Sequence, residues 1–138
     1  MKVLFLDFDG VAHPLGVGSE FQPHIIIRLN RILMEGEVTH LVVSSTWRHI
    51  AGGTDEWLKQ TLDEAHVALE DRWAGATPRS RFCCWGAIEE WLKERPRCTF
   101  VILDDMKAPR ALQAHAVHVD GALGLTEGDV AKALRILS

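Results

Sequence analysis

Two aspartates separated by a single residue, Asp7 and Asp9, follow the first apolar segment of the chain. On an extended strand their side chains point to the same side, and a bend at Gly10 would still let both face one pocket. A later apolar segment ends in the pair Asp104-Asp105. Carboxylates crowded together repel one another, which favours a bound divalent cation or a separation of their pKa values. Because the ligands are oxygens without paired Cys or His residues, the pattern predicts Mg²⁺.

Hydroxyl and basic side chains could complete a site for a phosphoryl group. Ser44 and Ser45 end a second apolar segment, and a serine hydroxyl or a backbone amide of the following turn can donate to a phosphoryl oxygen. A phosphate also needs a nearby cation, for which Arg48, Arg79 and Arg81 are the candidates. Each motif alone also has a structural interpretation, as a turn, a helix cap or an ion pair. Their combination at strand ends favours phosphoryl chemistry.

The elements that must position these residues alternate between strands and helices. Short apolar runs predict strands, and apolar residues at helical spacing between capping or breaking residues predict helices. The predicted strands cover residues 2–7, 38–43, 99–103 and 116–119, and the predicted helices cover 23–35, 54–65, 84–95 and the segment after Thr126. Glycine and proline predict a loop over 10–21. Residues 66–82 are ambiguous, with 67–69 compatible with a short strand and 75–81 interpreted as a loop.

This alternation predicts an α/β fold. It indicates a three-layer, Rossmann-like arrangement in which the first segment is the central strand of a parallel sheet and helices cover both faces. Ligands of such sheets bind beyond the carboxyl ends of the strands, where three of the predicted strands end in polar residues. The intervals between the motifs are too short for a large cap domain, so we expect an open cleft.

Composition and charge narrow the class of protein. The chain has 138 residues, of which 47% are hydrophobic and 25% charged, and this predicts a single domain over 1–138. The formal net charge of −4 gives no overall basic field for nucleic acid or anionic lipid. No apolar run is long enough for a membrane span or a signal-peptide core, so we expect a cytoplasmic, unprocessed protein. An odd count of three cysteines argues against a disulfide framework.

The motifs together resemble those of the haloacid dehalogenase (HAD) superfamily. The run Asp7-Phe-Asp9-Gly10-Val11 resembles motif I, Ser45 resembles motif II, an arginine near the start of the third helix would be motif III, and Leu103-Asp104-Asp105 resembles motif IV. Further segments are similar to the small HAD domains of Swiss Army Knife RNA repair proteins, which are related to polynucleotide phosphatase domains. These segments are His13-Pro14, the Ser-Ser-Thr-Trp-Arg run, Thr77-Pro78, residues 88–92 and Gly124-Leu-Thr126.

The resemblance implies phosphomonoester hydrolysis and a role for each matching residue. Asp7 would be the nucleophile that forms an aspartyl-phosphate, and Asp9 the general acid and base. The Asp7 and Asp104 carboxylates and the Asp9 backbone carbonyl would hold Mg²⁺, with Asp105 binding directly or through water. Ser45 and a cation would position the phosphoryl group.

The third helix departs from the family pattern. The related HAD domains carry an arginine shortly before a Glu-Ile pair of this helix, whereas this chain has Cys84 near that position. Arg81 or Arg79 from the preceding loop would have to supply the cation, and Arg81 is our choice. The other residues expected to contact substrate are Ser44, Arg48, Gly10 and Arg79. We interpret Cys84 itself as a packing thiol.

These patterns leave several functions open. The leading hypothesis is a Mg²⁺-dependent phosphatase acting on a phosphorylated small molecule or a nucleic acid end. The alternatives are a catalytically weak phosphate-binding or regulatory domain, and a receiver-like phospho-acceptor, whose motifs come in a different order along the chain. An open cleft fits a macromolecular end, or a small substrate enclosed by a neighbouring subunit of a homo-oligomer. We expect no membrane partner.

Two aromatic residues near the site have open interpretations. His13 is either a surface histidine of the loop or a substrate contact. Trp47 is either a half-buried aromatic residue or a contact for a base or leaving group at the mouth of the pocket.

Overall fold

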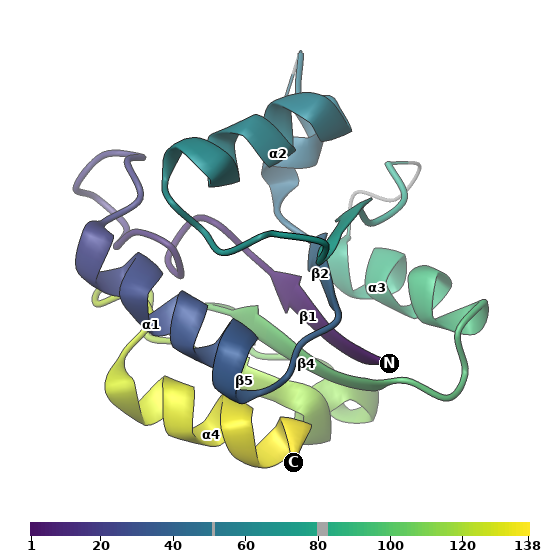
Figure 1. Ribbon diagram of the computed structural model, residues 1–138. Helices are drawn as coiled ribbons and strands as arrows, with labels where there is room; N and C mark the ends of the chain where they lie inside the picture. The colour runs from purple at the N-terminus through teal and green to yellow at the C-terminus, as the bar shows by residue number, and fades with distance from the viewer. Residues whose placement is uncertain (51, 80–82) are drawn as a thin grey trace.

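A five-stranded parallel sheet forms the centre of the molecule in the computed structural model, which describes residues 1–50, 52–79 and 83–138 (Figure 1). The strands are β1 (Lys2–Leu6), β2 (His40–Val43), β3 (Trp73–Ala76), β4 (Thr99–Asp104) and β5 (Ala116–His118). Their order across the sheet is β3-β2-β1-β4-β5, and neighbouring strands are parallel throughout. The predicted α/β fold with β1 at its centre is therefore confirmed.

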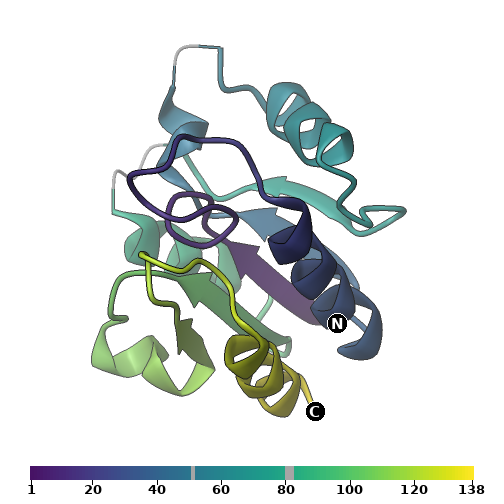
Figure 2. The same cartoon turned by 90° about the vertical axis from the view of Figure 1, so that its left-hand side faces the viewer.

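The register of the three middle strands brings their carboxyl ends to one level. Leu6 of β1 lies opposite Val43 of β2 and Leu103 of β4. The residues that follow these positions are Asp7, Ser44 and Asp104. The loop that leaves β1 lies beyond the strand tips at this edge of the sheet (Figure 2).

Helices cover both faces of the sheet. They are α1 (Pro23–Glu35), α2 (Asp55–Glu64), α3 (Cys84–Lys93) and α4 (Glu127–Leu137), with short 3₁₀ helices η1 (Thr46–His49) and η2 (Arg110–His115). Buried residues of α1, α2 and α4 pack with Leu4 and Leu6 of β1 in one hydrophobic core. Residues of α3 and η2 pack with Val3 and Phe5 in a second core on the other face. The central strand is thus buried on both sides, as its continuous apolar run predicts.

Local sequence signals set the helix ends. Pro23 opens α1, where its missing N–H costs nothing, and Gly36 follows the last turn. Thr126 and Asp129 form a capping box at α4, because the Thr126 side chain accepts from the Asp129 N–H while the Asp129 carboxylate accepts from the Thr126 N–H.

The segment before α3 differs from the prediction. The sequence allows a short strand at 67–69 and predicts a loop at 75–81. The structure instead has the strand β3, which includes Gly75 of the predicted loop. Val67 and Leu69 are buried in the first core without pairing in the sheet. The weak strand propensity of Trp-Ala-Gly-Ala is overridden by pairing with β2, so tertiary contacts decide the strand position.

The loop that follows β1 carries no additional domain. Residues 7–22 connect β1 to α1 without a helix or strand of their own, so the described residues contain no cap domain. No helix in the described part of the chain has the length and hydropathy needed to cross a bilayer.

Candidate active site

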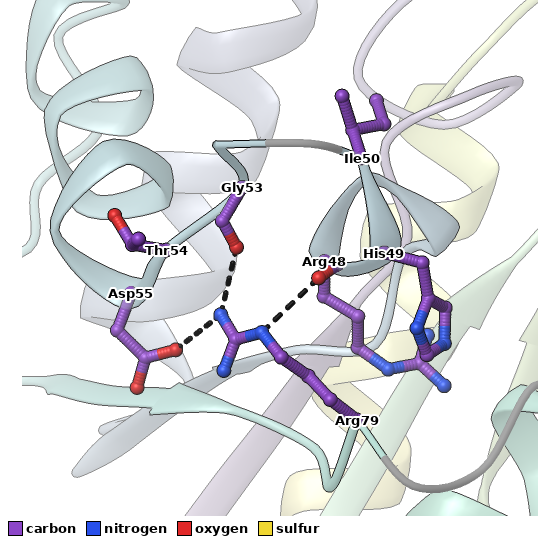
Figure 3. A pocket seen from close by; sticks show the side chains of 7 residues that line it. All are labelled: Arg48, His49, Ile50, Gly53, Thr54, Asp55 and Arg79. Atoms are coloured by element: carbon purple, nitrogen blue, oxygen red, sulfur yellow. Dashed lines mark hydrogen bonds and ion pairs between the residues drawn. The ribbon is translucent and has the colours of Figure 1, made fainter.

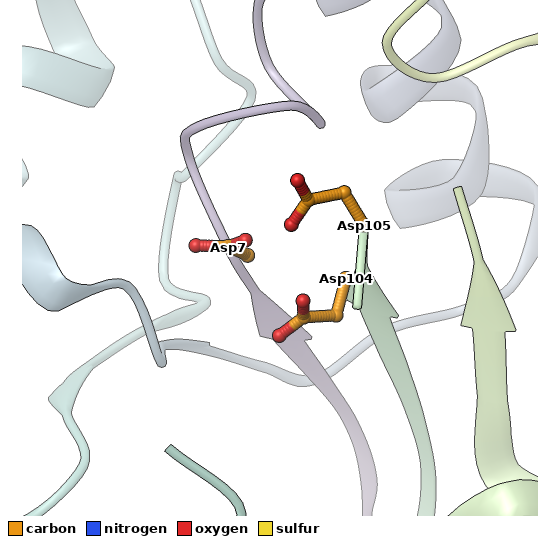
Figure 4. A group of neighbouring side chains, drawn as sticks. All are labelled: Asp7, Asp104 and Asp105. Carbon is orange, nitrogen blue, oxygen red and sulfur yellow. The ribbon is translucent and has the colours of Figure 1, made fainter. Parts of the chain in front are cut away.

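Three carboxylates meet where β1 and β4 end (Figure 4). Asp7 is the first residue after β1, Asp104 is the last residue of β4, and Asp105 follows it. Each offers one carboxylate oxygen, and these oxygens lie within 4.8 Å of one another. The parallel register brings together three of the four carboxylates that the sequence singles out. Such an oxygen-only set suits a hard divalent cation.

Burial, and then the crowding of the carboxylates, favours the protonated forms of Asp7 and Asp104. Burial, followed by the charges of Asp104 and Asp105, raises the pKa of Asp7 to about 9. Burial also raises the pKa of Asp104 to about 6, although its carboxylate accepts a hydrogen bond of 2.9 Å from the Met106 N–H. A divalent cation among the three groups would replace the protons that otherwise offset their repulsion, so the residues fit a metal site.

The Asp9 carboxylate lies outside this group of three. Its Oδ2 atom accepts a hydrogen bond of 3.0 Å from the Trp47 indole N–H, and its Oδ1 atom lies 2.8 Å from Nε2 of His13. The Asp9 side chain is 43% exposed. The sequence did not indicate this pairing, although His13 follows Asp9 by only four residues in the same loop.

The two serines after β2 have different hydrogen-bond partners. The Ser45 hydroxyl caps η1 and accepts a bond of 3.2 Å from the Trp47 N–H. The Ser44 hydroxyl oxygen is buried and has no hydrogen-bond partner among the described residues. Behind this turn lies Arg48, which is only 1% exposed and donates from Nη1 to the Ser44 and Ser45 carbonyls at 3.1 and 2.9 Å. Arg48 therefore fixes the backbone of both serines.

Electrostatic interaction links Arg48 to the carboxylates. Burial lowers the pKa of Arg48, while the nearby charge of Asp7 acts in the opposite direction. A buried guanidinium beneath the turn thus contributes positive charge to an acidic site without facing solvent.

Arg79 forms hydrogen bonds with residues of η1 and of the start of α2, as Figure 3 shows. It donates to Asp55 Oδ1 at 2.6 Å, to the Gly53 carbonyl at 2.9 Å and to the Arg48 carbonyl at 3.1 Å. These residues line a cleft of about 540 Å³ that also includes Thr54. The hydrogen bonds of Arg79 thus connect the loop after β3 to the start of α2. Arg81, our choice for the motif III cation, lies outside the described residues.

Cys84 occupies the position near which the family pattern has an arginine. Its Sγ atom donates to Asp104 Oδ2 at 3.8 Å. Burial, with the charges of Asp104 and Asp7, raises the pKa of Cys84 to about 12. The thiol therefore remains neutral at physiological pH. Sequence reasoning treated it as a packing residue, because a cysteine carries no signal of a carboxylate partner.

Gly10 allows the loop after β1 to approach Asp105. Its φ angle is +79°, and a Cβ atom at this position would lie 2.5 Å from Asp105 Oδ2. Only glycine combines this backbone conformation with such a close approach.

The fold and the site together define a class of protein. A parallel α/β fold with one acidic residue after the central strand and an acidic pair at the end of the neighbouring strand has the arrangement of HAD domains. A family model described as the HAD domain in Swiss Army Knife RNA repair proteins matches residues 3–130. The chain belongs to this family, and the resemblance noted in the sequence is confirmed. Comparisons with curated proteins and with solved structures find no match.

Proposed function

We propose that this domain is a Mg²⁺-dependent phosphomonoester hydrolase that uses Asp7 as its nucleophile. The observation that carries the proposal is the meeting of Asp7 with Asp104 and Asp105 at the carboxyl end of the central strand. Family membership also supports phosphatase activity, because HAD domains are typically phosphatases.

Three side chains would hold the metal ion. These are Asp7, Asp104 and Asp105, and the resemblance adds the backbone carbonyl of Asp9. When bound, Mg²⁺ would supply positive charge that offsets the carboxylates and the phosphoryl oxygens. The chain itself brings the ligands together through the register of β1 and β4.

The reaction would proceed in two displacements. An Asp7 carboxylate oxygen attacks phosphorus, the bond from phosphorus to the leaving oxygen breaks, and Asp9 gives its proton to that oxygen. Asp9 then takes a proton from water, whose oxygen attacks the phosphorus of the aspartyl-phosphate. Cleavage of the bond between phosphorus and the Asp7 oxygen releases inorganic phosphate and restores the free carboxylate.

Polar groups after β2 would contact the phosphoryl oxygens. The sequence favours Ser45, whose hydroxyl accepts from the Trp47 N–H and keeps its own hydrogen to donate, but we favour the Ser44 hydroxyl, which has no hydrogen-bond partner among the described residues. Arg48 would act from beneath by fixing this turn. Because Arg79 is bonded to Asp55, we assign the motif III cation to Arg81.

The family and the uncapped carboxyl end of the sheet support one class of substrate. The family is described from RNA repair proteins, and the described chain has no cap to close over a small molecule. We therefore favour a phosphorylated nucleic acid end. A small phosphomonoester enclosed by a second copy of the chain is the alternative.

Phosphate release tests this function. The panel contains oligonucleotides with 5′- or 3′-phosphates and small phosphomonoesters, each with and without Mg²⁺. We expect phosphate release that depends on Mg²⁺ and that Asp7→Asn abolishes. Asp63→Asn is the matched control at an exposed position of α2, and it should leave phosphate release intact. Mg²⁺-dependent phosphate binding without release from any substrate would contradict the proposal and favour a phosphate-binding domain. The observation that favours a phosphate-binding domain as the second candidate function is Cys84, which lies beside Asp104 near the position of the family arginine.

A further inference from the structure

Both carboxylate oxygens of Asp9 are held by ring nitrogens that come from different segments. His13 Nε2 lies 2.8 Å from Oδ1, and Trp47 Nε1 donates to Oδ2 at 3.0 Å. We propose that His13 and Trp47 are positioning residues that hold Asp9 for proton transfer to the leaving oxygen, an inference that rests on the proposed function. We refer to the two residues as the Asp9 clamp.

The His13 ring is fixed by a second hydrogen bond and by burial. Its Nδ1 atom lies 2.9 Å from the Pro14 carbonyl oxygen, which can only accept, so Nδ1 carries a hydrogen. This bond turns Nε2 toward Asp9. Only 4% of His13 is exposed, so of the two interpretations that the sequence left open, that of a surface histidine is wrong. A histidine with both ring nitrogens engaged has a single orientation.

The Trp47 ring is fixed by aromatic neighbours. It stacks with Phe21 and with Trp57, whose ring centroids are 5.7 and 6.0 Å away, and it forms an edge-to-face pair with Phe8 at 5.0 Å. The His13 ring lies against two of these rings, 6.4 Å from Phe21 and 6.3 Å from Trp47. The two residues of the Asp9 clamp therefore belong to one packed aromatic row, which fixes their positions relative to each other.

Such a clamp matters because the Asp9 side chain is nearly half exposed. A half-exposed carboxylate without partners would sample several rotamers, and only some of them bring an oxygen within proton-transfer distance of the leaving group. Packing alone does not require two ring nitrogens to converge on one carboxyl group. The convergence therefore points to a role in orienting Asp9.

The leaving group provides a selective test of this role. A p-nitrophenolate leaves without protonation, whereas the alkoxide of a nucleoside 5′-phosphate needs a proton from the general acid. The value of kcat/KM reports the steps up to departure of the leaving group. We define the discrimination ratio as kcat/KM for p-nitrophenyl phosphate divided by kcat/KM for a nucleoside 5′-phosphate. An unfolded fraction of a variant cancels from this ratio, so poor folding does not obscure the result.

Four variants separate the clamp from its packing. Trp47→Phe keeps the ring and removes its N–H, and His13→Ala removes the other partner. His13→Gln retains a nitrogen near the position of Nε2. Trp57→Phe is the matched control, because it changes an indole of the same row that does not contact Asp9. We expect the ratio to rise about ten-fold in Trp47→Phe and His13→Ala, to be partly restored in His13→Gln and to stay unchanged in Trp57→Phe.

The outcomes distinguish this inference from the function on which it rests. An active wild type with unchanged ratios in Trp47→Phe and His13→Ala would overturn the clamp alone. An equal rise in Trp57→Phe would also overturn it, because packing would then explain the effect. A wild type that releases phosphate from neither ester would overturn the proposed function and the clamp together.

Discussion

The Asp7 carboxyl combines two properties that conflict in a nucleophile. It lies where phosphoryl chemistry is expected, yet burial and its acidic neighbours raise its pKa to about 9. A carboxyl that keeps its proton at neutral pH is a poor nucleophile. A cation bound by the same three carboxylates would favour the charged form. The reactivity of Asp7 should therefore depend on the metal, beyond any contact between metal and substrate.

The two serines after β2 should respond differently to loss of the hydroxyl. Ser45→Ala removes the cap of η1 and should lower the free energy of unfolding by about 1 kcal/mol. Ser44→Ala removes a buried hydroxyl without a partner, so stability should be unchanged or slightly higher, while kcat/KM for phosphate release falls. Urea denaturation and steady-state kinetics measure the two effects. A stable Ser44→Ala protein with full activity would exclude this hydroxyl as a phosphoryl contact.

At the scale of elements, the turn after β1 lies against the acidic group through the close approach of Gly10 to Asp105. Gly10→Ala should strain the backbone, and its Cβ atom should press against Asp105. Gly16 lies in the same loop with a similar positive φ, but a Cβ atom added there has no neighbour within 4 Å, so Gly16→Ala is the matched control. Each change should cost about 1 kcal/mol of stability through the backbone. Because only Gly10 lies against Asp105, only Gly10→Ala should also weaken the binding of Mg²⁺. Calorimetry measures this affinity. Equal Mg²⁺ affinity in both variants would show that the close approach at Gly10 does not support the site.

The elements also show how far the sequence could be read. Apolar runs with polar ends predicted β1, β2 and β4 and, through them, the meeting of Asp7 with Asp104 and Asp105. The strand β3 was missed because Trp-Ala-Gly-Ala has little strand propensity and is held by its neighbour.

Side-chain partners were harder to predict than strands. The bonds of Arg79 to Asp55 and of Trp47 to Asp9 join residues 24 and 38 positions apart. No local pattern encodes such pairs, because they depend on how η1, α2 and the loops pack together. His13 is the exception, since its closeness to Asp9 in the chain was a signal that could have been used.

At the scale of the whole molecule, stability should depend on pH and metal together. Because the pKa values of Asp7 and Asp104 are raised in the folded state, the folded chain binds more protons than the unfolded chain above about pH 4. Their contribution to the free energy of unfolding therefore falls as pH rises toward the folded pKa values. Bound Mg²⁺ opposes this loss, so its stabilising effect should be larger at about pH 8 than at about pH 6.

Thermal unfolding in Mg²⁺ and in EDTA checks this dependence. Asp104→Asn should reduce both the pH-dependent loss in EDTA and the rise in Tm with Mg²⁺. Asp63→Asn, on exposed α2, should behave as the wild type. A rise in Tm with Mg²⁺ that is the same in all three proteins would place the binding of the metal elsewhere.

Formation of a phosphoryl group on Asp7 tests the central claim most directly. The protein is mixed with Mg²⁺ and an active phosphomonoester, quenched in acid and digested, and the peptide that contains Asp7 is sequenced by mass spectrometry. Asp9→Asn is included, because loss of the general base should slow hydrolysis of the intermediate and increase its amount when p-nitrophenyl phosphate is the donor. We expect one phosphoryl group on Asp7 that depends on Mg²⁺ and is absent from Asp7→Asn. Phosphate release without modification of Asp7, or modification of another residue, would contradict the account.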